Sequence, residues 1–156
     1  MEDLRVLFFF YMVQALLMIL AGTMFFNLRV KKAQIFRATL YYGLAIWGVR
    51  SFYAYYHIPY GTHTLLLAII HTLILYFTLK QSLIYCLAIT GFSFSLIMLG
   101  GGLVGLGVNL ARITIDKVLD NVWLNVLFGQ LENILLIVYL FLGKLFNLTL
   151  DKMVRE

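Results

Sequence analysis

Charge is scarce in this sequence. Asp, Glu, Lys and Arg together make up 12% of its 156 residues, whereas soluble domains carry about 25%. Such a chain has too few charged side chains to cover a water-soluble core, so a soluble globular domain is excluded. The single cysteine, Cys86, excludes an internal disulfide and a cysteine-based metal cage. We expect Cys86 to be a small residue of the core.

Apolar residues dominate instead, at 63% of the chain. A transmembrane helix needs about 20 mostly apolar residues. Runs of this kind lie at 6–26, 36–56, 63–79, 83–108 and 121–146. The pattern predicts an all-α fold, a polytopic transmembrane helix bundle of about five helices within residues 1–146. Residues 147–156 are expected to be a cytoplasmic tail that continues the last helix. The fourth run could also break at its glycines and form a re-entrant segment.

Basic residues give the orientation. The loop after the first run holds Arg29, Lys31, Lys32 and Arg37, and such residues accumulate on the cytoplasmic side of a membrane. We therefore expect the N-terminus outside, the C-terminus inside, and a multi-pass protein of the cell membrane. The net charge of +5 is then a topology signal, and we expect the lipid bilayer, rather than nucleic acid, as partner.

The segment "HIPYGTH", residues 57–63, separates the second and third runs. Pro59 disfavours helix in the residue before it, and Gly61 permits a tight reversal, so the segment predicts a turn on the outer side. Tyrosines before it are typical of the aromatic belt at a membrane interface. His63 lies at this interface, whereas His71 lies two helical turns deeper and is expected on the same helix face.

Two ionizable residues fall inside apolar runs: Arg50 in the second and Glu132 in the fifth. Intramembrane charges usually face the bundle interior, pair with each other and mark function. They predict an ion pair and a polar pocket open to the outside. The candidate ligand site comprises Arg50, His63, His71, Gln130, Glu132 and Asn133. A buried ion pair that fixes helix register and binds no ligand is an equally open interpretation.

The glycine-rich stretch "LGGGLVGLG", residues 99–107, lacks the Lys-Ser/Thr ending of a phosphate loop. Close helix packing or a flexible break is the better interpretation, and the spacing of Gly101 and Gly105 favours a homodimer contact. The segment "ARITIDKVLDN", residues 111–121, mixes apolar and charged side chains and predicts an interfacial segment. Since no catalytic constellation or set of metal ligands is present, we expect neither an enzyme, nor a metal site, nor a cofactor.

The basic loop, the segment "RSFYAYYHIPYGTHTLLL" and a last helix that runs into a charged tail together resemble the N-terminal membrane sensor region of Gram-positive, peptide-sensing (Agr-receptor-type) histidine kinases. The resemblance implies a bacterial inner membrane, an outward pocket for a small molecule or peptide, and a cytoplasmic signalling partner. Five predicted spans are fewer than such receptors commonly have. The chain carries no phospho-accepting histidine region or ATP-binding domain, so we expect no kinase activity.

Two functions from different classes therefore remain. The first is a receptor or sensor domain whose last helix passes on the signal. The second is a transport component, a membrane subunit in which the same residues hold a solute. A structural scaffold is a third, and it predicts that Glu132→Gln is tolerated.

Overall fold

The fold is known from a computed structural model, which describes residues 3–56, 58, 62–110, 117–118, 121–146 and 148–150. Within these residues the structure is helical and has no strand, which confirms the all-α class. The helices in chain order are α1 (Leu4–Val6), η1 (Leu7–Tyr11), α2 (Met12–Phe25), α3 (Lys32–Tyr55), α4 (Thr62–Leu79), α5 (Leu83–Leu110), α7 (Val122–Glu132) and α8 (Ile134–Phe146). Here η1 is a π-helical turn that joins α1 to α2 without a break.

Several helices are long and apolar enough to cross a membrane. Three of them are Leu4–Phe25, Thr62–Leu79 and Leu83–Val108, and α7 with α8 makes a fourth if this pair, bent by 40°, is one broken span. Helix α3 has 24 residues and is about 36 Å long, but it is less apolar than these. A membrane protein is therefore supported, while five crossings and their orientation stay predictions.

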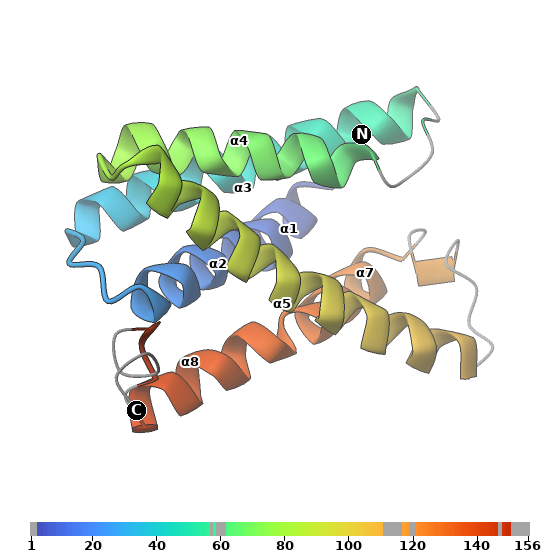
Figure 1. The fold of residues 1–156 in the computed structure, drawn as a ribbon. Coiled ribbons are helices and arrows are strands. Elements are labelled where there is room, and N and C mark those ends of the chain that lie inside the picture. Colours follow the sequence, from blue (N-terminus) through green and yellow to red (C-terminus); the bar gives the residue numbers. More distant parts are fainter. Residues whose placement is uncertain are drawn as a thin grey trace.

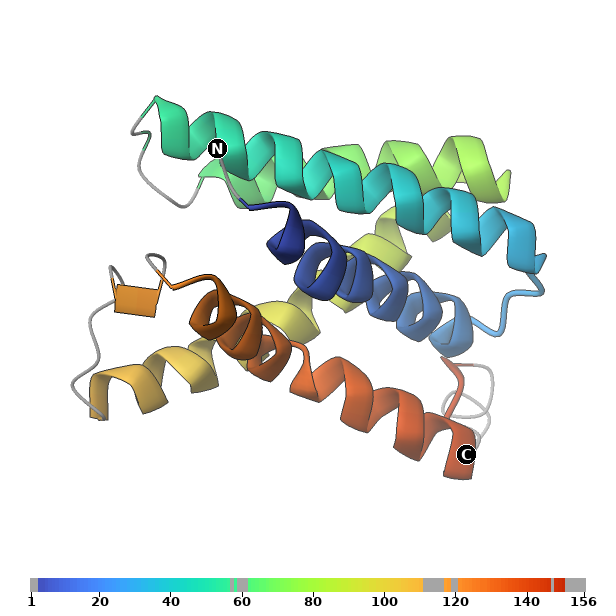
Figure 2. The same ribbon diagram turned by 180° about the vertical axis from the view of Figure 1, so that it is seen from behind.

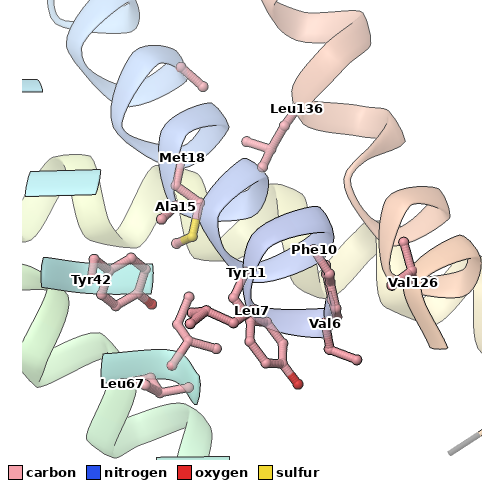
Figure 3. Close-up of a cluster of buried hydrophobic side chains, with 12 residues drawn as sticks. Val6, Leu7, Phe10, Tyr11, Ala15, Met18, Tyr42, Leu67, Val126 and Leu136 are labelled. Carbon is pink, nitrogen blue, oxygen red and sulfur yellow. The ribbon is translucent and has the colours of Figure 1, made fainter. Parts of the chain in front are cut away.

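The continuous N-terminal helix formed by α1, η1 and α2 occupies the middle of the molecule. Helix α2 contacts α3, α5 and α8, and α3 packs along α4 (Figure 1). Figure 3 shows side chains of η1 and α2 at the centre of a buried cluster that also takes in Tyr42, Leu67, Val126 and Leu136 from the surrounding helices. Cys86 is fully buried in a second cluster, as expected.

Glycines set the closest helix contacts. A Cβ atom at Gly100 would collide with the backbone carbonyl of Glu132, so the α5 backbone lies directly against the α7 backbone there. Small residues allow such approach between membrane helices. Helix α5 runs unbroken through residues 99–107, so the alternative of a break at the glycines is not observed. Within this stretch the tight helix contact is at Gly100, whereas a Cβ atom at Gly102, Gly105 or Gly107 would meet no atom within 4 Å.

Two predicted features fall largely on residues that the structure does not describe. His57, Pro59 and Gly61 of the outer turn lie outside the described residues, as does most of the predicted interfacial segment 111–121. Of the tail, only 148–150 are described. Helix α8 ends at Phe146, and the Tyr139 hydroxyl donates a hydrogen bond of 3.0 Å to the Leu148 carbonyl, which holds this residue against the helix end.

Candidate functional site

Arg50 lies near the C-terminal end of α3, half-buried between helices. Its guanidinium carbon is 5.9 Å from the ring centre of Phe10 and 5.3 Å from that of Tyr11. A guanidinium within about 6 Å of an aromatic ring is attracted by the negative ring face, and more strongly where water is excluded. The aromatic residues of η1 therefore provide a favourable place for a cation inside an apolar bundle.

One cavity next to Arg50 has a volume of about 200 Å³ and lies between α2, α3, α4 and α5. We call it the His63 cavity. Its polar lining comes from Gln14, Tyr42, Arg50, His63 and Thr64. His63 is in the first turn of α4, so this cavity lies at the end of the bundle where the predicted outer turn joins α3 to α4.

A second cavity, of about 290 Å³, lies between η1, α3, α5 and α7. We call it the Glu132 cavity. Arg50, Asn125 and Glu132 give it polar groups, and Phe10, Phe128 and residues of α5 give it apolar walls. Arg50 and Gly101 line both cavities. The Arg50 side chain therefore lies between the two cavities, one lined by His63 and the other by Glu132.

Arg50 and Glu132 share a cavity without coming within salt-bridge distance of each other. Their charges interact electrostatically, but the salt bridge within the described residues joins Arg5 to Asp3, at 2.8 Å. Both side chains line the Glu132 cavity. The predicted ion pair between Arg50 and Glu132 is therefore not observed among the described residues, and what the two side chains share is a cavity wall.

His71 occupies a different place from the other candidates. Its side chain is fully buried, with Nδ1 3.0 Å from the Thr90 hydroxyl, which also accepts a hydrogen bond of 2.9 Å from Thr72. The imidazole packs against Tyr42 with ring centres 4.3 Å apart. Tyr42 lines the His63 cavity and His71 does not, so His71 stands behind the cavity wall rather than on it.

Gln130 and Asn133 flank Glu132 in the sequence but have different surroundings from it. The Gln130 side chain donates a hydrogen bond to the Phe9 carbonyl and so ties α7 to η1. Asn133 is the residue between α7 and α8 and is fully buried. Its amide oxygen and nitrogen have no hydrogen-bond partner among the described residues. Neither residue lines the two cavities.

Several wall residues were not predicted from the sequence. Gln14 is a polar residue within the first apolar run, and this signal could have marked it. Phe10 and Tyr42 gave no comparable signal, because aromatic residues are ordinary in apolar runs. Asn125 lies close to other polar residues at the start of the fifth run, so its polarity did not single it out. Within the described part of the chain, no three His, Cys, Asp or Glu side chains come together to hold a metal ion.

Comparison of the chain with protein-family models, with curated proteins and with solved structures finds no significant match. The site's own geometry therefore carries the functional conclusion. It brings the Arg50 guanidinium, the Glu132 carboxyl group and the His63 imidazole to the walls of two small cavities that are otherwise mainly apolar.

Proposed function

We propose that this chain is a receptor or sensor domain of a bacterial inner membrane, with five spans, the N-terminus outside and the C-terminus inside. It takes up a small ligand or short peptide from the outer side. The observation that carries the proposal is the position of Arg50, which lines the His63 cavity and the Glu132 cavity at once. The resemblance of the sequence to peptide-sensing kinase membrane regions supports the same function.

The charges suggest the ligand class. A guanidinium binds carboxylates through two parallel hydrogen bonds, and a carboxylate such as Glu132 accepts from an amine or amide. A ligand that carries both groups, such as an amino acid or a small peptide, would satisfy Arg50 and Glu132 together. The two volumes together lie near the lower part of the roughly 300–1,000 Å³ range of ligand pockets, which favours a small molecule.

A route for the signal follows from the bend after Glu132. Glu132 is the last residue of α7, Asn133 follows, and α8 begins at Ile134. The two helices meet at 40°, and α8 packs against α2 and α5. A ligand that binds Glu132 would change the angle between α7 and α8 and so move α8 relative to a cytoplasmic signalling partner. Such coupling requires that the ligand bind the two bend states with different affinity.

Thermal unfolding of the purified protein against a library of amino acids, peptides, vitamins and nucleobases tests binding. A ligand at a hundredfold excess over its dissociation constant adds about 2.7 kcal/mol of stability. We expect a compound that stabilises the wild type and fails to stabilise Glu132→Gln. Asp3→Asn, which removes an equal charge at the protein surface, is the matched control and should keep the response. If no compound acts and Glu132→Gln is as stable as the wild type, the scaffold is the better function.

A transport component is the second candidate, favoured by the interrupted helix pair α7 and α8. Discontinuous helices with buried polar groups at the break form substrate sites in many transporters, and Asn133 is a buried amide at such a break. Uptake of a stabilising compound into vesicles that contain the protein would support transport. Binding without uptake, together with a ligand response when the C-terminus is fused to a signalling domain, would support the receptor.

A further inference from the structure

Helix α2 runs beside α3 (Figure 2). A large apolar groove lies between these helices, and none of its lining residues lines the two cavities at Arg50. Its volume is about 590 Å³. From the N-terminal helix it is lined by Phe8, Met12, Val13, Leu16 and Leu20, and from α3 by Lys32, Ile35, Phe36, Thr39 and Leu40. Phe8 is 61% and Phe36 69% exposed, so these rings contact whatever surrounds the protein.

One end of the groove is charged, and the rest of its lining is mainly apolar. Lys32 begins α3 and follows directly on the loop that joins it to α2, so it lies at the same end of the groove as Leu20. Arg29 and Lys31 belong to that same loop. The apolar walls continue from there along the N-terminal helix to Phe8. Positive charge is thus concentrated at one end, and the remaining lining is apolar apart from the Thr39 hydroxyl.

The dimensions match one membrane leaflet. From Leu20 to Phe8 the helix rises about 18 Å at 1.5 Å per residue, and half of the hydrocarbon core of a bilayer is about 15 Å. An acyl chain whose headgroup lies at Lys32 would therefore run along the groove and end near Phe8. The predicted topology puts the Lys32 end on the cytoplasmic side, where the leaflet carries anionic lipid.

We propose that this groove is a binding site for an anionic phospholipid, with one acyl chain between α2 and α3 and the phosphate at Lys32. The site requires that the helices lie in a bilayer and does not depend on the receptor function. Charge complementarity selects the headgroup, because a zwitterionic lipid offers the same chain but no net negative charge to Lys32.

Fluorescence quenching by brominated lipids tests the site on the full chain. Phe36→Trp places a reporter in the groove, after Trp47 and Trp123 are replaced by Phe. The protein is reconstituted in phosphatidylcholine vesicles in which the brominated component is either phosphatidylglycerol or phosphatidylcholine, at equal mole fraction. We expect stronger quenching by brominated phosphatidylglycerol, and a relative affinity that falls about fivefold in Lys32→Gln, since one lysine near the surface contributes about that factor.

Three variants serve as controls. Lys32→Arg should keep the preference for phosphatidylglycerol, which shows that a loss in Lys32→Gln is not a folding defect. Arg37→Gln should keep it too, because Arg37 is exposed, bonds to the Ala33 carbonyl of its own helix and does not line the groove. A tryptophan reporter in place of Phe77 of α4, which is 71% exposed, should be quenched equally by both lipids.

Other outcomes would overturn the site. Equal quenching of the groove reporter in the Phe36→Trp protein by the two lipids would mean bulk lipid only. Equal losses in Lys32→Gln and Arg37→Gln would mean diffuse attraction to the loop rather than a headgroup position. Weak quenching by either lipid, together with a dimer that disulfide cross-links through Phe36→Cys, would mean that a second copy of this chain covers the groove.

Discussion

The guanidinium carbon of Arg50 lies 5.3 Å from the ring centre of Tyr11. Tyr11 is fully buried and belongs to the π-helical turn that precedes α2. The Tyr11 ring is therefore a core side chain that also contacts the Arg50 guanidinium. Through this ring, the packing of the bundle is linked to the position of the Arg50 charge at the candidate site.

Replacing Tyr11 by leucine removes the ring but keeps most of the apolar volume. We expect the free energy of unfolding to fall by about 1–3 kcal/mol, from lost packing and lost attraction of the Arg50 cation. Phe8→Leu, in a ring that is 61% exposed, is the matched control and should cost much less. Unfolding in mixed detergent, followed by circular dichroism, measures both. Equal losses for the two variants would refute a special role for Tyr11.

The contact between α5 and α7 predicts opposite results for two nearby glycines. Alanine at Gly100 places a methyl group against the Glu132 carbonyl, which is backbone and cannot move away alone, whereas alanine at Gly102 meets no atom within 4 Å. We expect Gly100→Ala to destabilise by about 1–3 kcal/mol and Gly102→Ala to be neutral or stabilising by up to about 1 kcal/mol. Melting temperatures of the two variants decide the matter, and a stable Gly100→Ala protein would contradict the packing.

The sequence was sufficient to predict the helical class and the positions of the helices. Each predicted apolar run coincides with a helical region within a few residues, because uninterrupted apolar stretches can only satisfy their backbone in a bilayer by forming helices. The bend between α7 and α8 was not predicted. Asn133 is neither proline nor glycine, and a single asparagine in an apolar run carries no signal for a helix break.

The candidate site was predicted only in part, because spacing along a helix does not say which helices are neighbours. Arg50, His63 and Glu132 were expected together, and Arg50 does share one cavity with each of the other two. His71 was expected at the same pocket, yet its imidazole points to Thr90 behind Tyr42. The His71 imidazole lies at the Thr90 hydroxyl of α5. This contact depends on how α4 and α5 are rotated about their axes, which the sequence does not give.

The buried Thr90 hydroxyl bonds to two side chains of α4, so its removal should be costly. Thr90→Val keeps the shape and leaves His71 and Thr72 without this partner. We expect a loss of about 1–3 kcal/mol of unfolding free energy, the usual cost of an unsatisfied buried polar group. Ser95→Ala on the same helix is the control, because Ser95 is exposed and bonds only to the Gly91 carbonyl. A similar stability of both variants would argue against the buried network.

The N-terminal end predicts a small dependence of stability on pH. Asp3 caps the first helix and accepts hydrogen bonds from the Arg5 side chain and backbone, which lowers the pKa of its carboxyl to about 2. In the unfolded chain that pKa is about 3.9. Because the folded pKa is the lower one, the carboxylate stabilises the fold above about pH 4, and this contribution is lost as the pH falls from about 4 through 2.

Asp3→Asn isolates this effect, since asparagine still caps a helix but does not ionise. We expect the wild type to lose more thermal stability than Asp3→Asn between about pH 6 and pH 2, and the difference between them to be small, because Asp3 and Arg5 lie at the surface and salt screens exposed pairs. Melting curves at both pH values, at low and high salt, measure it. A difference that grows with salt, or a wild type that gains stability in acid relative to the variant, would refute the assignment to Asp3.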